Sequence, residues 1–231
     1  MRRGDLLVVL MRWPVAGTGK SRLAAALGAE TAHRLHRGLV ADTLAWSAAW
    51  PRLIAFTPPE ARDRVARAAP GAALAAQPGG HLGDRLAHAF AGGFAAGARR
   101  VLLVGSDSPT LPETLLEACV EAAEPETVSL VGALDGGFVA MAAARAAAAR
   151  LPAVFDGVEW STSRTAAQVT ARAHAAGLAV RDAGRWYDVD EVADLDRLAA
   201  DLARDPGRAR HTAAAIAGRM AVATAPWAPA R

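Results

Sequence analysis

Residues 5–23 read DLLVVLMRWPVAGTGKSRL, and this stretch decides the fold class. Residues 5–11 form an apolar run rich in Leu and Val, which is typical of a β-strand buried on both faces of a sheet. A loop with proline and glycine follows over residues 13–19, and helical spacing starts at Ser21. A buried strand that leads through a glycine-rich loop into a helix is the opening unit of an α/β protein.

The rest of the chain repeats this alternation of short apolar runs and helical segments. We expect further strands at residues 52–56, 72–76, 100–105, 127–132, 137–142 and 178–182. We expect helices at residues 21–50 with an interruption near Gly38, and at residues 58–69, 84–96, 161–176 and 191–204. A further helix is expected with Pro112 in its first turn. The sequence therefore predicts a Rossmann-like, three-layer αβα fold with a mainly parallel sheet. One domain is expected over residues 1–205, followed by an Ala/Pro-rich tail over residues 206–231.

The composition argues against several classes of protein. The 231 residues carry 26 Lys plus Arg and 23 Asp plus Glu, and the basic residues are scattered among the acidic ones, so nucleic-acid binding is not favoured. The single cysteine, Cys119, excludes a disulfide scaffold. The first apolar run is too short for a signal peptide, and charged residues or glycine break the Ala-rich stretches before membrane-spanning length. We therefore expect a cytoplasmic protein that does not enter a membrane.

One lysine stands among 25 arginines, and it is Lys20 in the first loop. This bias toward Arg is typical of a GC-rich genome, but a flexible ammonium differs chemically from a rigid guanidinium. The loop joins a strand to a helix N-terminus, where backbone N–H groups converge on an anion, and Lys20 and Arg22 add positive charge. The loop is therefore a candidate phosphate site, and the alternative is a helix start with an ordinary solvated Lys and Arg.

Gly19-Lys20-Ser21 also matches the second half of the P-loop motif, whose first glycine would fall on residue 14. That residue is Pro14, which has no N–H and a fixed φ, so it cannot begin the nest that holds a β-phosphate. In a P-loop protein the partner strand's apolar run normally meets the metal-linked Asp directly, whereas here Gly105 and Ser106 intervene before Asp107. A P-loop is therefore disfavoured.

Six ordered blocks of sequence resemble a bacterial glycosyltransferase-A-like family, the nucleotide-diphospho-sugar transferases or arsenosugar-biosynthesis glycosyltransferases, which is related to 2-phospho-lactate guanylyltransferases. The blocks are Pro14 to Leu23 with Gly17, Lys20, Ser21 and Arg22; Gln77 to Arg85 with Gly80 and Gly83; Gly105 to Leu111 with Ser106 and Asp107; Asp135-Gly136-Gly137-Phe138; Phe155 with Trp160-Ser161-Thr162; and Asp188 to Leu195 with Asp190. The resemblance implies the GT-A, nucleotide-diphospho-sugar transferase fold. It also implies that the first three blocks bind nucleotide and phosphates. Ala16, His81 and Val131-Gly132 depart from the family pattern, which indicates an altered substrate.

Asp107 follows the predicted strand at residues 100–105, at the carboxyl end where open α/β sheets bind ligands. One or two carboxylates, completed by phosphate oxygens and water, are typical of Mg²⁺ or Mn²⁺ in nucleotide sites. The resemblance implies a second metal carboxylate at Asp190, with Asp188 orienting the loop. Helix capping is the alternative role for all three residues.

The block Asp135-Gly136-Gly137 lies between two predicted strands, and its glycines allow a ligand to approach the backbone closely. The resemblance implies that the sugar or acceptor binds beside this turn, so Asp135 is expected to bind a hydroxyl or act as a base. A plain hairpin turn is the alternative. Trp160, Ser161 and Thr162 offer an aromatic platform with hydroxyls, or else Ser161 caps a helix and Trp160 lies in the core. His33 and His36 lack a third ligand and are expected at the surface.

The main hypothesis is a metal-dependent glycosyltransferase that moves a sugar from a nucleoside-diphosphate sugar to a small acceptor. Lys20, Asp107 and Asp135 are the expected catalytic residues, with positive charge offsetting the charge on the leaving diphosphate. The closest alternative is a nucleotidyltransferase, which attacks the α-phosphate of an NTP and releases pyrophosphate. A non-catalytic nucleotide-binding protein is a third possibility. The sequence leaves open the nucleobase, the sugar, the acceptor and the oligomeric state, including a homodimer.

Overall fold

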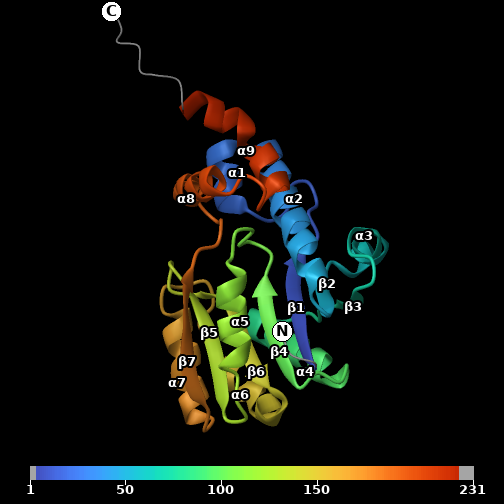
Figure 1. Ribbon diagram of the computed structural model, residues 1–231, viewed down its shortest axis with the longest axis vertical. Helices are drawn as coiled ribbons and strands as arrows, with labels where there is room; N and C mark the ends of the chain where they lie inside the picture. Colours follow the sequence, from blue (N-terminus) through green and yellow to red (C-terminus); the bar gives the residue numbers. More distant parts are fainter. Residues whose placement is uncertain (1–3, 224–231) are drawn as a thin grey trace, which may run out of the picture.

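The computed structural model describes residues 4–223, which form a seven-stranded sheet with helices on both faces (Figure 1). The strands are β1 (Asp5–Arg12), β2 (Arg52–Thr57), β3 (Ala73–Ala76), β4 (Arg100–Gly105), β5 (Thr127–Ala133), β6 (Phe138–Ala144) and β7 (Ala179–Trp186). Their order is β3-β2-β1-β4-β6-β5-β7, and every neighbouring pair is parallel except the two that involve β6. The predicted α/β fold with a mainly parallel sheet is confirmed.

Apolar side chains on both faces of the sheet explain the three layers. In β1, Leu7 and Val9 pack with α2 (Ala29–Trp46), α3 (Arg62–Ala68) and α5 (Glu113–Glu121). Val8 points to the other face, against α4 (Leu82–Ala95), α6 (Leu151–Phe155) and α7 (Thr165–Ala175). Short 3-10 turns complete these layers at η1 (Ser47–Ala49), η2 (Pro59–Ala61) and η3 (Arg145–Arg150). The continuous Leu and Val run of β1 is therefore explained by burial of both faces of this strand.

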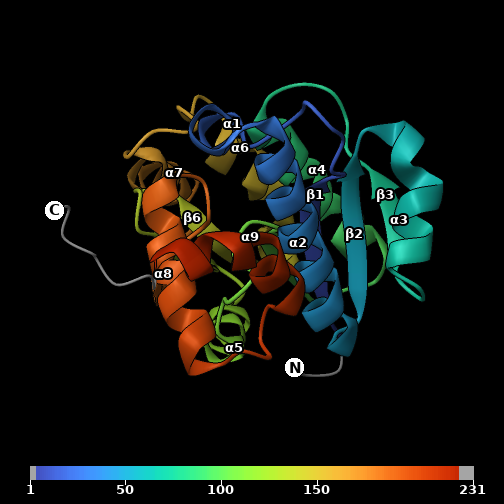
Figure 2. The same ribbon diagram turned by 90° about the horizontal axis from the view of Figure 1, so that it is seen from above.

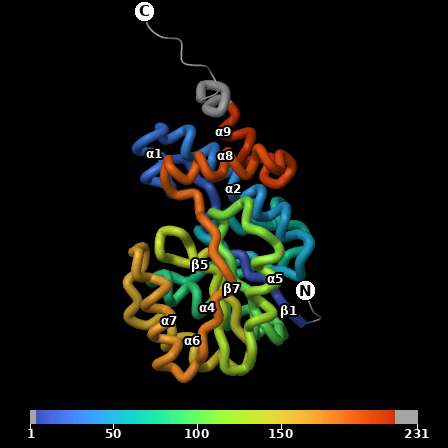
Figure 3. The backbone as a smooth tube through the Cα atoms, turned by 60° about the vertical axis from the view of Figure 1, so that its left-hand side comes forward, coloured from blue at the N-terminus to red at the C-terminus, as the bar shows by residue number. Residues whose placement is uncertain are grey.

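A third apolar cluster joins four helices beyond the end of the sheet to which β1 and β4 point (Figures 1 and 3). These helices are α1 (Ser21–Leu27), α2, α8 (Val192–Arg204) and α9 (Arg210–Ala223), and we call them the helical cap. Leu23, Leu35, Leu195 and Leu198 are among its buried side chains. The cap lies over the carboxyl ends of the parallel strands, so it borders the edge where this class of fold binds ligands.

The break in the first helical segment falls at Gly28, so the prediction of an interruption near Gly38 is wrong. Gly28 ends α1 and precedes α2 with a φ of +86°, a conformation that favours glycine. Gly38 instead lies inside α2, where an added Cβ would come within 2.8 Å of Thr212 Cα. Gly38 therefore allows α9 to approach α2 closely.

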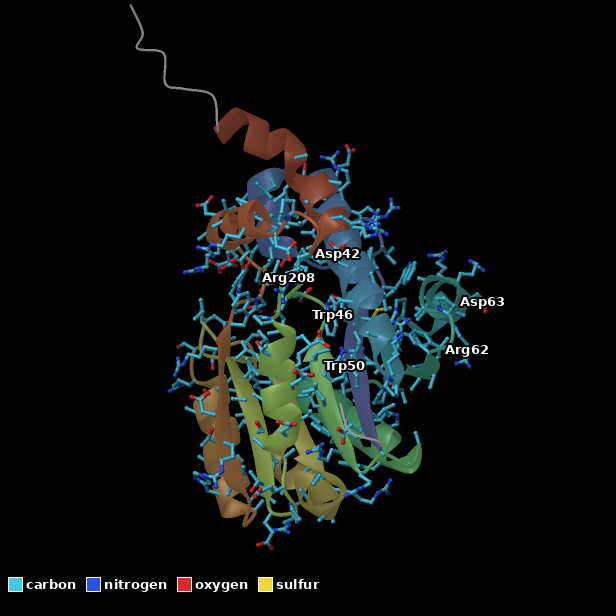
Figure 4. The ribbon with its side chains drawn as sticks, in the orientation of Figure 1. Asp42, Trp46, Trp50, Arg62, Asp63 and Arg208 are labelled. Atoms are coloured by element: carbon cyan, nitrogen blue, oxygen red, sulfur yellow. The ribbon has the colours of Figure 1, made fainter. Side chains whose placement is uncertain are left out.

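Helix α9 lies within the predicted tail, so part of that tail is helical. Asp42 on α2 accepts hydrogen bonds from the backbone N–H groups of His211 at 3.1 Å and Thr212 at 2.7 Å. It also accepts one from the Thr212 hydroxyl at 2.6 Å. Figures 2 and 4 show α9 beside α2, with Asp42 near the start of α9. Residues 210–223 of the predicted tail therefore form a helix that packs on the domain, and residues 224–231 lie outside the described residues. Within residues 4–223, no helix is both long and apolar enough to cross a membrane.

Candidate functional site

A cleft of about 440 Å³ opens at the carboxyl edge of the sheet, where the strands meet the helical cap. Its walls come from the ends of β1, β2 and β4, the β5–β6 turn, the segment between β7 and α8, and the first turns of α4. The predicted site residues that line it are Lys20, Arg22, Ser106, Asp107, Asp135, Gly137, Trp160, Ser161, Thr162 and Asp190. The topology therefore brings distant segments of the sequence to one edge.

Lys20 lies at the centre of the charged part of this cleft. Its Nζ lies 3.0 Å from Asp107 Oδ1 and 3.1 Å from Asp190 Oδ1, and it donates a hydrogen bond to the Val189 carbonyl at 2.7 Å. The Lys20 side chain is 5% exposed, whereas Asp107 and Asp190 are 40% and 44% exposed. The three oxygens can take all three donors of the ammonium, so Lys20 holds the two carboxylates together.

Burial alone would lower the pKa of Lys20, but attraction to Asp107 and Asp190 outweighs burial and raises it. The ammonium therefore stays charged at neutral pH. Arg22 lies further out, with its Nη1 at 3.4 Å from both Asp190 Oδ2 and Glu191 Oε1. Both predicted cations of the first loop thus contact carboxylates, and the more exposed Arg22 is the one that faces solvent.

Two further carboxylates, Asp135 and Asp188, line the same cleft. Burial, followed by repulsion from Asp135, raises the pKa of Asp188 to about 6. Sequence reasoning gave Asp188 only an orienting role. The signal that could have found it is the alternation Asp188-Val189-Asp190, because Val189 is fully buried in the cap cluster and both flanking aspartates line the cleft.

Asp107 and Asp190 have the chemistry that a magnesium or manganese ion requires. Both present hard oxygen ligands, and one oxygen of each already contacts the same positive group. Among residues 4–223, no set of three or more His, Cys, Asp or Glu side chains could hold a metal ion. The remaining ligands of an ion on these two carboxylates would therefore come from substrate oxygens and water.

A second group of cleft residues comes from β1, α4 and the segment after β3: Arg12, Gln77 and Arg85. The buried Nε of Arg85 lacks a hydrogen-bond partner, and no ion pair in the described part of the chain involves its guanidinium. Gln77 and Arg85 belong to a block for which the family resemblance implies nucleotide and phosphate binding, but neither residue was singled out as a site residue. Their position now places positive charge and a polar amide beside the carboxylates.

The turn at Asp135 is a hairpin and also part of the cleft. Asp135 Oδ1 accepts a hydrogen bond from the Gly137 N–H at 2.8 Å, which is the bond of an Asx turn, and Asp135 lines the cleft. Gly136 has a φ of +94°, and an added Cβ would overlap the backbone of Ser163. Gly136 therefore positions the turn against the neighbouring loop and does not line the cleft.

Trp160 combines the two roles that the sequence left open. Its ring packs against Phe138 and Phe155, with centroids 6.5 Å and 6.2 Å apart, and it also lines the cleft. Helix α7 begins at Thr165, so the predicted start at residue 161 is wrong, and Ser161 has a φ of +61°. Ser161 is therefore not a helix cap. It belongs to a tight turn that lines the cleft.

Several predicted nucleotide residues lie outside the cleft lining: Pro14, Gly17, Ser21, Gly80 and Gly83. Gly83 allows close packing, since an added Cβ would lie 3.0 Å from the Phe155 carbonyl oxygen. His36 is the opposite case, because it was expected at the surface but is 4% exposed and lines the cleft. Burial lowers the pKa of His36, so the imidazole is neutral at physiological pH.

Comparison with known proteins supports the resemblance seen in the sequence. A family model described as "Uncharacterized protein conserved in bacteria (DUF2064)" matches residues 40–162, more than half of the chain, and the chain belongs to this family. The chain is similar to a "putative nucleotide-diphospho-sugar transferase" from Desulfovibrio desulfuricans. The two are 27% identical with a TM-score of 0.83, over 94% of this chain and 96% of that one. No curated protein matches the chain.

Two more distant structures share the fold alone. A nucleotidyl transferase from Methanothermobacter is 15% identical with a TM-score of 0.55, over 88% of this chain and 99% of that one. The 4-diphosphocytidyl-2C-methyl-D-erythritol synthase from Anaerococcus prevotii is 11% identical with a TM-score of 0.52, over 86% and 99%. The nucleotide-diphospho-sugar transferase fold is therefore shown, and these structural neighbours are transferases.

Proposed function

We propose that this DUF2064 family member is a glycosyltransferase that moves a sugar from a nucleoside-diphosphate sugar to a small acceptor with Mg²⁺ or Mn²⁺. One observation carries the proposal: a single cleft joins a polar and cationic wall to four carboxylates. The wall comes from β1, α4 and the segment after β3, and the carboxylates are Asp107, Asp135, Asp188 and Asp190. The likeness to the Desulfovibrio protein supports the same class of substrate.

The diphosphate of the donor would bind among the guanidinium groups of the cleft, while Lys20, whose donors are taken by Asp107, Asp190 and Val189, would hold the two carboxylates in place. Arg12, Arg22 and Arg85 all line the cleft, and Arg85 has an unpartnered Nε. A guanidinium binds a phosphate through two parallel hydrogen bonds, which suits an anion with several oxygens. Cationic groups that already line the cleft would stabilise the charge that develops on the departing diphosphate.

Asp107 and Asp190 would hold the divalent ion, which would supply further charge stabilisation for the diphosphate. The two carboxylates come from the end of β4 and the segment before α8, and Lys20 fixes their separation. Their partial exposure, 40% and 44%, leaves them accessible to an ion that arrives with the nucleotide. The residues present thus fit the group that the family resemblance implies.

The acceptor would bind beside Asp135 and Asp188, next to Trp160. During transfer, an acceptor oxygen forms a bond to the anomeric carbon, the bond from that carbon to the diphosphate oxygen breaks, and the acceptor proton moves to a carboxylate. Asp135 or Asp188 takes the proton. A raised pKa such as that of Asp188 makes a carboxylate a better base.

The test is to incubate the protein with NTPs and with NDP-sugars, each with Mg²⁺ or Mn²⁺ and a set of small hydroxyl acceptors. Release of a nucleoside diphosphate from an NDP-sugar is the expected result. Release of pyrophosphate from an NTP would instead assign nucleotidyl transfer, the reaction class of the Methanothermobacter neighbour. Nucleotide binding without either product would assign a non-catalytic binding protein.

A further inference from the structure

Gln77 is the first residue after β3, and its side chain crosses the carboxyl edge of the sheet. Its backbone N–H donates to the Phe56 carbonyl at 2.8 Å. Its side-chain Nε2 donates to the Met11 carbonyl at 2.9 Å and to the Ala55 carbonyl at 2.8 Å. The residue is therefore attached to both β1 and β2, and its amide has one fixed orientation.

The two partners settle which way the amide faces. Both are carbonyl oxygens, which only accept hydrogen bonds, so the NH2 branch must point toward them and uses both of its hydrogens. The other branch, Oε1, has no partner in residues 4–217, and it is not among the buried side-chain atoms that lack a partner. Gln77 lines the cleft, so Oε1 is an accessible and rigidly held acceptor there.

The surroundings of Gln77 suit a flat heterocycle. Leu82, in the first turn of α4, is 38% exposed and lines the cleft, which is unusual for a large apolar side chain in this protein. Leu10 and Leu86 add further apolar surface to the same lining, and Arg85 contributes a guanidinium. A cleft that offers apolar surface, one fixed acceptor and a cation matches a nucleobase that is linked to phosphates.

We infer that Gln77 is a specificity-determining residue that binds the nucleobase of the donor through a base N–H, with the ring against Leu82. The inference rests on the proposed function and specifies how its nucleotide is recognised. A base without that N–H would leave Oε1 facing an acceptor or a methyl group. If Gln77 Oε1 is covered by a base and has no hydrogen-bond donor to accept from, the affinity for the nucleotide falls roughly 10–100-fold.

The experiment is isothermal titration of the wild-type protein with UDP, GDP, CDP and ADP in the presence of Mg²⁺. The nucleotide that binds best is then compared with its analogues methylated at each base N–H. We expect methylation at one position to weaken binding to the wild type by roughly 10–100-fold. In Gln77→Met, which keeps the length and lacks the amide, the nucleotide and that analogue should bind equally.

Two controls separate base recognition from phosphate binding. Ribose 5-diphosphate, which has no base, should bind equally to the wild type and to Gln77→Met. Gln168→Met changes the only other glutamine of the chain, which lies outside the cleft lining, and should leave the effect of methylation unchanged. Circular dichroism melting shows that each variant is folded before titration.

The outcomes separate failure of the Gln77 inference from failure of the proposed function. If every methylated analogue binds the wild-type protein as tightly as the unmethylated nucleotide does, the inference fails. Nucleotide binding and the proposed function then stand. A methylation effect that persists in Gln77→Met also overturns the inference alone. If the wild type binds neither nucleoside diphosphates nor ribose 5-diphosphate, the proposed function fails, and the inference fails with it.

Discussion

The ammonium of Lys20 lies 3.0 Å from the Asp107 carboxylate, and each residue follows the carboxyl end of a different strand. The first follows β1 and the second follows β4, which pair in parallel, so the sheet places them together. The Lys20 side chain is almost fully buried, whereas the Asp107 side chain is exposed to solvent. Lys20 therefore fixes a carboxylate that remains available to ligand.

The first prediction concerns the lone lysine. Lys20→Arg should lower kcat/KM by at least about tenfold, because a planar guanidinium cannot place three donors on the same three oxygens in a buried position. Steady-state NDP release measures this. The matched control is Arg204→Lys, at an exposed position of α8 outside the cleft lining, and it should leave kcat/KM unchanged. Full activity of Lys20→Arg would show that the single lysine reflects composition alone.

The second prediction concerns the carboxylate at the end of β4. Asp107→Asn should lower turnover by about 100-fold or more, because a neutral amide no longer holds a divalent ion or balances Lys20. The variant should still fold, with a far-UV circular dichroism spectrum like that of the wild type. Asp196→Asn, on the exposed side of α8, should leave turnover unchanged. Equal turnover in Asp107→Asn and the wild type would contradict the metal role.

The third prediction concerns the pH dependence of stability. The folded protein raises the pKa of Asp188 from 3.8 to about 6, so folding favours its protonated form. The stability that this provides is fully present below about pH 4 and is lost as the pH rises through 6. The melting temperature of Asp188→Asn, relative to the wild type, should therefore rise between pH 4 and pH 7 in EDTA. A constant difference across that range would contradict the assignment.

The fourth prediction concerns the attachment of α9. Asp42→Ala removes an acceptor of three hydrogen bonds and should lower the free energy of unfolding by about 1–3 kcal/mol. Urea unfolding followed by circular dichroism measures the change. Asp63→Ala, at an exposed position in α3, should change it by less than about 0.5 kcal/mol (Figure 4). Equal effects of the two substitutions would rule out a specific role of Asp42.

The fifth prediction concerns the reactivity of the single cysteine. Burial raises the pKa of the Cys119 thiol to about 11, and the side chain packs in the core against the sheet. Iodoacetamide at pH 8 should therefore leave Cys119 unmodified in the folded protein and modify it fully in urea. Mass spectrometry of the intact protein gives the readout, and rapid labelling without denaturant would contradict the buried position.

The sequence predicted the strands well because each carries a local signal. The run at residues 100–105 forms β4 with the predicted bounds, and the turn at residues 135–137 joins two antiparallel strands. Helix α9 was missed because its alanine-rich sequence has no clear apolar face, and its position depends on Gly38 and Asp42 from α2. Contacts between residues about 170 positions apart leave no local pattern to read.

The candidate site was predicted only where a local sequence signal marks its residues. The ends of strands mark Asp107 and Asp135, so their approach to a common edge follows from the parallel sheet. The contact of Lys20 with Asp190 joins residues 170 positions apart, and only the folded cap reveals it. His36 was assigned to the surface because nothing in its helix spacing indicates that the first loop covers it.

The helical cap gives the cleft a property that its lining residues alone do not reveal. Lys20 precedes the first residue of α1, and Asp190 lies just before α8, whereas Asp107 lies in the loop that follows β4 of the sheet. The charge balance of the cleft and the seating of the cap on the sheet therefore depend on the same ionic contacts. A change in the packing of the buried leucines of α8 would therefore also move Asp190 relative to Lys20 and Asp107.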